Sequence, residues 1–174
     1  LKFNENGKFK VLMVSDFHVN ARCNPKLIKA LSALLDYSEP DLVILGGDII
    51  TASRGEMDDE QFRKALEYII EPIVSRKIPW FHVYGNHDKE GGFSNEYQQK
   101  VYESMPYCIS EAGPEDVSGV GNFVRTVYSP KTGKPAFNIW AMDSHSEVRD
   151  YVRIFNLKPD ASRVVLPNPL GSGS

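Results

Sequence analysis

Residues 41–48 read DLVILGGD, a short run of apolar strand formers that ends in two glycines and an aspartate. An apolar run of this length, without polar alternation, is typical of a strand covered on both faces in a parallel sheet. Similar runs lie before and after it, FKVLMVS at 9–15 and PWFHVYG at 79–85. With the apolar part at 41–46, they predict three strands of one buried sheet.

The segments between these runs have helical periodicity. Pro25 can occupy the first turn of a helix over 25–39, in which apolar residues recur at helical spacing: Leu27, Ile28, Leu31, Leu34 and Leu35. Acidic residues open the segment 57–77, where Pro72 is expected to kink or end a second helix whose apolar face comprises Phe62, Leu66, Ile69, Ile70 and Ile73. The order βαβαβ implies a parallel sheet with right-handed crossovers.

The pattern changes after the third strand. A helical stretch at 94–105 is followed by strand-like runs at 121–129 and 135–144, which the turn sequence PKTGK joins. The fold class is therefore α/β, with a βαβαβ start followed by a β-hairpin. We expect one domain over residues 1–166 and a flexible tail or cloning scar over 167–174.

Composition limits the classes of function. The chain has 174 residues, 41% hydrophobic and 25% charged, which suits a globular domain with a sizeable core. Its net charge of -3 gives no basic field for a nucleic acid backbone, so a nucleic acid partner is not expected. No apolar run is long enough to span a bilayer, and two distant cysteines outside any CxxC pattern indicate neither a zinc ribbon nor a disulfide scaffold.

Polar residues that bind metals follow all three predicted strands. Asp16 and His18 follow the first, Asp48 follows the second, and Asn-His-Asp at 86–88 follows the third. The carboxyl ends of parallel strands meet at one edge of a sheet, where ligands bind. Asp16 and His18, two residues apart in an extended segment, would point the same way, and the Asp48 carboxylate has two oxygens that can bridge two ions. Carboxylate and imidazole ligands without thiolates suit zinc, manganese or iron.

Each of these residues also has an ordinary structural explanation. Asp16 can cap a helix, Asp48 can bind turn amides, and Asn86 can adopt a left-handed turn conformation. A nucleotide-binding domain that uses LGGD as a phosphate loop is a weaker alternative, because no Gly-Lys-Ser/Thr follows. The joint occurrence on consecutive strand ends favours a metal site.

The same residues carry a family resemblance. VSDFH, PDLVILGGDI and VYGNHD resemble, in order and context, the D-x-H, G-D and G-N-H-D/E motifs of the calcineurin-like metallophosphoesterases. GNHDKEGGFSNE, GPEDVSGVGNF and MDSHS are similar to the branch containing purple-acid-phosphatase-like proteins and Dcr-type phosphatases. The resemblance covers residues 9–158 and implies the amino-terminal part of a four-layer α/β/β/α sandwich.

The resemblance implies a dinuclear metal centre. Asp16 and His18 would bind the first ion, Asp48 would bridge both, and Asn86 would bind the second. The ions would be iron, manganese or zinc, and a metal-bound hydroxide would attack phosphorus in line.

Two further residues receive catalytic roles from the resemblance. His87 would contact the phosphate and assist the leaving group, and Asp88 would orient the His87 ring. The implied activity is hydrolysis of a phosphoric ester, with a phosphorylated small molecule or a phosphoprotein as substrate.

The chain departs from the family pattern in its histidines. Three later histidines, two of them in a G-H-x-H motif, complete both metal shells in the family, but this chain has only His18, His82, His87 and His145. We expect His82 to be a hydrogen-bonded core residue and His145 to lie at the rim of the active site.

The missing histidines have functional and structural consequences. The second metal site is expected to be weak, and activity impaired, so a non-catalytic scaffold or protein-binding module on the same fold is the alternative function. A truncated domain would leave one sheet face uncovered, which predicts self-association.

Overall fold

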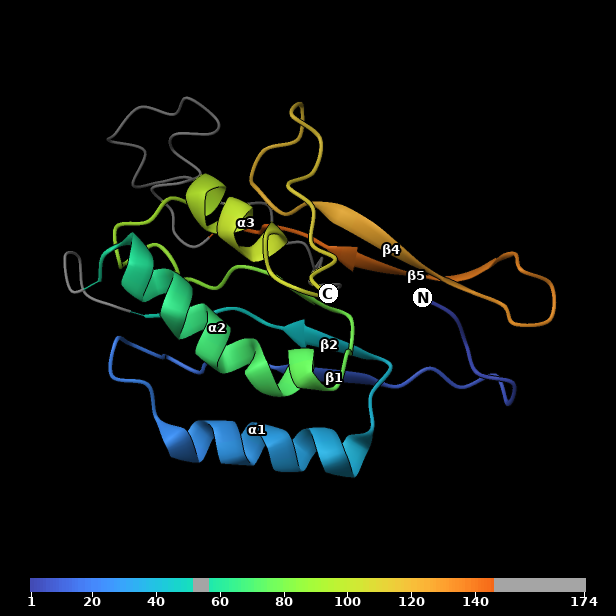
Figure 1. Ribbon diagram of the computed structural model, residues 1–174. Coiled ribbons are helices and arrows are strands. Elements are labelled where there is room, and N and C mark those ends of the chain that lie inside the picture. The colour runs from blue at the N-terminus through green and yellow to red at the C-terminus, as the bar shows by residue number, and fades with distance from the viewer. Residues whose placement is uncertain (52–56, 146–174) are drawn as a thin grey trace, which may run out of the picture.

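Three parallel strands form the central sheet of the computed structural model, which describes residues 1–51 and 57–145 (Figure 1). The strands are β1 (Val11–Val14), β2 (Leu42–Leu45) and β3 (Trp80–His82), with β2 in the middle. The pairing is parallel throughout, with Val11 opposite Leu42 and Ile44 opposite Phe81. The predicted parallel sheet is confirmed, although each strand is shorter than its apolar run.

Three helices follow the predicted positions. They are α1 (Pro25–Ser38), α2 (Asp59–Ser75) and α3 (Asn95–Glu103). The Asn24 side chain caps α1, and Asp58 forms a capping box with Gln61 at the start of α2. Pro72 lies inside α2, which continues to Ser75, so the proline does not end the helix at once.

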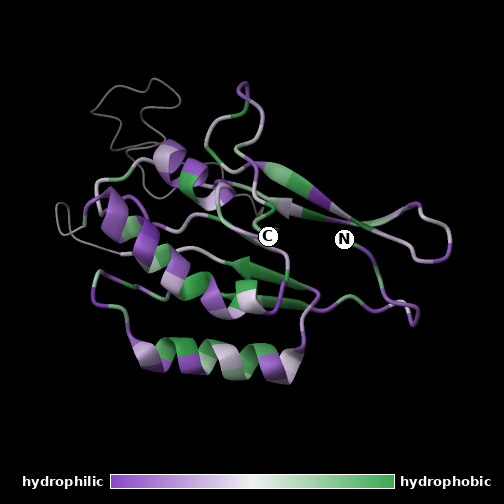
Figure 2. Cartoon of the chain, in the orientation of Figure 1, coloured by the Kyte–Doolittle hydropathy of each residue, from purple (hydrophilic) through white to green (hydrophobic). Residues whose placement is uncertain are grey.

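All three helices contribute to a core on one face of the sheet. Figure 2 shows green segments on α1 and α2 and green strands in the sheet, as expected for amphipathic helices that cover an apolar sheet. The largest fully buried side chains of this core are those of Leu31, Leu35, Leu45, Ile49, Phe62, Leu66, Ile69, Ile70, Trp80 and Tyr102. Leu34, which was expected on the buried face of α1, is 46% exposed because it lies at the margin of the stripe.

A β-hairpin covers part of the other face. β4 (Phe123–Tyr128) and β5 (Pro135–Ala141) pair antiparallel, as predicted, and a turn at 129–134 joins them. A second core lies between this hairpin and the sheet, and its buried members are Leu42, Phe81, Phe123 and Ala141. Helices, sheet and hairpin therefore make three layers in the part of the chain that the structure describes.

The hairpin leaves β1 uncovered. Val11 is 44% exposed and Met13 is 62% exposed, whereas the neighbouring β2 residue Leu42 is fully buried on the same face. The expectation that the first strand is covered on both faces is therefore wrong, because within residues 1–51 and 57–145 β1 is an edge strand and the core under the hairpin includes none of its residues.

The expected carboxyl-terminal tail and the end of the expected domain lie outside the described residues. The expected tail at 167–174 and the end of the expected domain fall within 146–174, which the structure does not describe. Within 1–51 and 57–145, none of the helices has the length and apolar character that crossing a bilayer requires.

Candidate metal centre

The segments that follow β1 and β2 run side by side beyond the strands. The Asp16 N–H donates to the Gly47 carbonyl at 3.0 Å, and the His18 N–H donates to the Asp48 carbonyl at 2.9 Å. The backbone between Val14 and Val19 is therefore fixed against the GGD segment. This pairing brings the residues after two different strands to one edge of the sheet, as expected for a parallel α/β sheet.

Three predicted ligands meet at this edge. One ligand atom each from Asp16, His18 and Asp48 lies within 4.8 Å of the other two. Asp48 is buried at 6% exposure, while Asp16 and His18 are exposed. Two carboxylates and an imidazole at this spacing fit a divalent or trivalent cation in an open site.

The three residues share an unusual backbone conformation. The φ angles are 57° for Asp16, 47° for His18 and 53° for Asp48, all in the left-handed region that residues other than glycine rarely adopt. Asp16 and His18 therefore do not lie on an extended segment as expected, because β1 ends at Val14. Unfavourable conformations of this kind persist where the surrounding structure enforces them, often at functional sites.

A threonine orients the His18 ring. Its hydroxyl oxygen lies 2.9 Å from His18 Nδ1, while His18 Nε2 faces Asp16 Oδ1 at 3.7 Å. The Thr51 hydroxyl can accept the Nδ1 hydrogen, which leaves Nε2 as the ring atom directed toward the carboxylates. Thr51 was not predicted, although its place three residues after Asp48 put it near the same sheet edge.

Asp48 is enclosed by the loop after β3. A Cβ atom at Gly85 would lie 2.6 Å from Asp48 Cγ, and a Cβ atom at Gly47 would lie 2.7 Å from Gly85 Cα. Glycine is therefore required at both positions for this approach. Asp48 Oδ1 also accepts the His87 N–H at 2.8 Å, so the turn-amide explanation of Asp48 is correct in part.

Asn86 lies between two residues that touch Asp48. Gly85 packs against the Asp48 carboxylate, and the next N–H along the chain, that of His87, donates to it. Asn86 is exposed, and it is not among the residues with a positive φ angle, so the left-handed turn explanation does not hold. Its role as a metal ligand stays a prediction.

Asp88 has a different set of partners from the one expected. Its carboxylate is buried and accepts N–H groups from Gly85 at 2.6 Å, Asp48 at 3.0 Å and Ile49 at 3.3 Å. Burial raises the pKa of the Asp88 carboxyl, and these three donors oppose that increase. The carboxylate fixes the two loops to each other and, among the described residues, is not the group that contacts the His87 ring.

The carboxylate at the His87 ring belongs to Glu90. Glu90 Oε1 lies 2.7 Å from His87 Nδ1, and this hydrogen bond raises the pKa of His87 above its usual value. The His87 and His18 rings lie edge to face with centroids 5.6 Å apart, so His87 borders the cluster. Glu90 was not predicted, because the partner of the His87 ring was expected at the adjacent residue, Asp88.

The remaining two histidines do not join the cluster. His82 is 1% exposed, pairs with the Ser110 hydroxyl at 2.8 Å through Nδ1, and stacks on Tyr102. Burial lowers the pKa of His82 to about 3, so it is a neutral core histidine as predicted.

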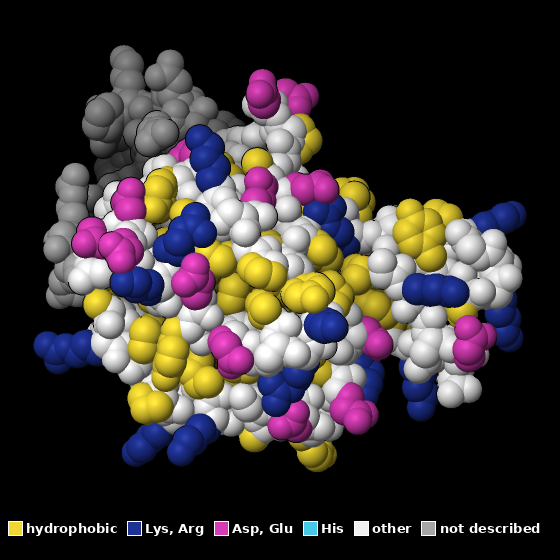
Figure 3. Space-filling model, viewed as in Figure 1, with side chains coloured by type: hydrophobic (Ala, Val, Ile, Leu, Met, Phe, Trp, Pro, Cys, Tyr) yellow, Lys and Arg dark blue, Asp and Glu magenta, His cyan; other side chains and the backbone are white. Residues whose placement is uncertain are grey.

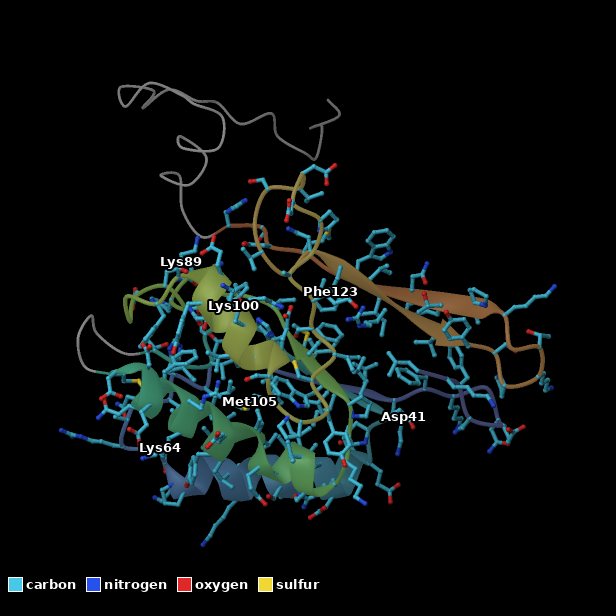
Figure 4. The ribbon with its side chains drawn as sticks, turned by 45° about the horizontal axis from the view of Figure 1, so that its top comes forward. Asp41, Lys64, Lys89, Lys100, Met105 and Phe123 are labelled. Carbon is cyan, nitrogen blue, oxygen red and sulfur yellow. The ribbon has the colours of Figure 1, made fainter. Side chains whose placement is uncertain are left out.

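His145 lines a cavity of about 440 Å³ beside the loop that carries His87. The other contributors to this cavity are Lys89, Gly92, Phe93, Ser94, Asn95, Glu96, Ser118, Gly119, Val120 and Asp143. Figure 4 labels Lys89 near the start of α3, on the side of the molecule where this loop meets the helix. The expected place of His145 at an active-site rim stays a prediction.

Comparison with known proteins gives a family match. The family model described as calcineurin-like phosphoesterase matches residues 9–164. The phosphatase DCR2 of Saccharomyces cerevisiae is 29% identical in an alignment 165 residues long, and the match covers 83% of this chain and 28% of DCR2.

Two relatives from Arabidopsis thaliana are named as inactive. "Probable inactive purple acid phosphatase 14" is 26% identical over 172 residues, covering 84% of this chain and 42% of the relative. "Probable inactive purple acid phosphatase 29" is 26% identical over 168 residues, with 83% and 42% coverage. The chain thus spans less than half the length of each of these relatives.

Proposed function

Because the chain belongs to the calcineurin-like phosphoesterase family, we propose that it supplies the amino-terminal ligands of a metal-dependent phosphoric ester hydrolase. The observation that carries this proposal is the meeting of Asp16, His18 and Asp48 within 4.8 Å. These residues come from two loops, and the backbone bonds between the loops hold them in place before any cation binds. Such preorganisation is what a catalytic metal site requires.

The proposed centre holds two cations, of iron, manganese or zinc. Asp16 and His18 would hold the first, Asp48 would contribute to both, and Asn86 would contribute to the second. When bound, the cations supply the Lewis-acid chemistry that activates water for attack on phosphorus. This chain would supply the second site with only the exposed Asn86 amide and the shared Asp48 carboxylate. The second site is therefore expected to bind its cation more weakly than the first.

The chain's own residues have distinct parts in the proposed reaction. The His87 ring lies edge to face with that of His18, and in this proposal His87 would contact the phosphoryl group and pass a proton to the leaving alcohol. Asp88 maintains the geometry by joining the loops.

The cavity beside the His87 loop is the proposed place for the rest of the substrate. Lys89 lines it together with Glu96 and Asp143, so both signs of charge are present. A polar alcohol part, from a phosphorylated small molecule or from a phosphorylated side chain of a protein, fits this polar surrounding better than an apolar one.

Metal binding by the purified protein tests the proposal. In calorimetric titrations with Mn²⁺ or Zn²⁺, Asp48→Asn should weaken binding at least tenfold, because a neutral amide replaces the carboxylate while still accepting the His87 N–H. Asp116→Asn, an exposed carboxylate in the segment between α3 and β4, is the matched control. Two equivalents of metal per chain, together with turnover of p-nitrophenyl phosphate, support the hydrolase.

A scaffold without catalysis is the second candidate. The names of two Arabidopsis relatives describe them as inactive, and neither His82 nor His145 joins the described cluster. Purified protein that binds no metal, and hydrolyses neither p-nitrophenyl phosphate nor bis-p-nitrophenyl phosphate with added Mn²⁺, would support this alternative.

A further inference from the structure

The stretch HDKE at 87–90 folds into a tight turn beside the metal cluster. The Glu90 N–H donates to the His87 carbonyl at 3.0 Å, which closes the turn and brings the two side chains together. Glu90 Oε1 then reaches His87 Nδ1 at 2.7 Å. This contact is thus set by the local backbone as well as by the side chains.

Buried contacts hold the turn in place. The fully buried Gln98 of α3 donates through Nε2 to the Asp88 carbonyl at 2.7 Å and to the Phe93 carbonyl at 3.1 Å. From the other side, the Asp88 carboxylate binds the loop after β2 through its bonds to Asp48 and Ile49. The backbone that carries His87 and Glu90 is therefore attached to α3 and to the β2 loop.

Asp88 is already engaged by three backbone donors, whereas Glu90 faces the ring. Both side chains of the pair are partly exposed, 40% for His87 and 53% for Glu90. Exposed pairs of this kind contribute little to folding stability. The position of the pair beside the metal cluster thus suggests a role in chemistry more than in folding.

A carboxylate at Nδ1 determines where the ring carries its hydrogen. An ionised carboxylate can only accept, so in the neutral ring Nδ1 must carry the hydrogen and Nε2 must be the acceptor. The same bond limits rotation of the ring. When the ring is protonated, Nε2 carries the second hydrogen, and its transfer to the leaving-group oxygen returns the neutral ring with the hydrogen on Nδ1.

We propose that Glu90 is the positioning residue of His87, fixing its tautomer and ring orientation for proton transfer to the leaving group. This inference rests on the proposed hydrolase function for its chemical meaning. The effect of Glu90 on the tautomer of the His87 ring can be measured in protein that has no enzymatic activity.

Nuclear magnetic resonance of metal-free protein labelled with ¹⁵N-histidine tests the structural content. At about pH 9, where a histidine is neutral, the His87 ring should be the Nδ1–H tautomer, and Glu90→Ala should shift it toward Nε2–H. Glu90→Gln keeps an acceptor oxygen and should retain the wild-type tautomer in part. Glu115→Ala, an exposed carboxylate in the segment between α3 and β4, is the control and should change nothing. An unchanged His87 tautomer in folded Glu90→Ala overturns the proposal.

Kinetics of the metal-loaded protein test the chemical content. An alkyl phosphate has a poor leaving group that needs a proton, whereas p-nitrophenolate leaves without one. Glu90→Ala should lower kcat for the alkyl ester at least tenfold and for p-nitrophenyl phosphate by less than threefold, with similar KM values. Equal losses on both esters overturn the role in proton transfer. No turnover by wild-type protein instead contradicts the proposed function, while the tautomer result still stands.

Discussion

The Asp88 carboxylate and the backbone N–H of Asp48 lie 3.0 Å apart, and this contact joins the loop after β3 to the loop after β2. The same carboxylate accepts the Gly85 and Ile49 N–H groups. Asp88 is therefore a structural link between two loops that carry predicted ligands.

Replacement of Asp88 by asparagine should disrupt this link. The asparagine amide would turn an NH₂ group toward at least one backbone N–H, leaving a buried donor without an acceptor. We expect the free energy of unfolding to fall by about 2–4 kcal/mol, measured by urea denaturation. Affinity for Mn²⁺ should fall at least tenfold in calorimetry, and Asp116→Asn should change neither quantity. Unaltered metal affinity would contradict the structural role.

Gly85→Ala should displace Asp48. The added Cβ would lie 2.6 Å from Asp48 Cγ and would overlap its Oδ1, so the carboxylate or the loop must move. We expect loss of metal binding by calorimetry, with a fall of about 1–3 kcal/mol in stability. Gly133→Ala is the control, since its Cβ meets no atom within 4 Å and its positive φ of 67° adds only backbone strain. Equal metal affinity in both variants would count against the close approach.

The fold was largely predictable because its elements have strong periodic signals. Burial of Phe62, Leu66 and Ile69 on one face of α2 followed from their spacing. The exposure of Met13 could not be predicted from the sequence. An apolar run indicates that a strand can be buried, but it does not show which elements cover that strand.

The meeting of three predicted ligands was predictable from the sequence. The topology of a parallel sheet brings Asp16, His18 and Asp48 together, as the sequence order indicated. The partners Thr51 and Glu90 were missed, since side-chain hydrogen bonds depend on the course of each loop. The left-handed conformations of Asp16, His18 and Asp48 were not predicted either. They depend on the backbone hydrogen bonds between the two loops and not on residue type.

His82 should make the protein less stable in acid. Its pKa is about 3 in the folded protein because of burial, below its value of about 6.5 in an unfolded chain. The unfolded state therefore binds more protons between these values. The stabilisation is complete above about pH 6.5 and decreases by about 1.4 kcal/mol per pH unit as the pH falls toward 3.

Replacement of His82 by phenylalanine isolates this contribution. The new ring can still pack on Tyr102 but cannot titrate, so this part of the pH dependence should disappear from urea denaturation curves between about pH 4 and 7. The loss of the Ser110 bond affects stability at every pH and does not alter the slope. Equal slopes in the variant and wild type would show that His82 is not buried as described.

The uncovered face of β1 should promote self-association. Met13 is 62% exposed beside Val11 on an edge strand, and hydrophobic side chains are also visible on the projecting hairpin in Figure 3. Apolar edge strands pair readily with other chains, and a lysine opposes such pairing. We therefore expect Met13→Lys to raise the dissociation constant for self-association at least tenfold, about 1.4 kcal/mol, in sedimentation velocity over a range of concentrations. Tyr37→Ser, which removes a 91% exposed aromatic residue from α1, is the control and should leave association unchanged. A wild-type chain that stays monomeric at every concentration would contradict this prediction.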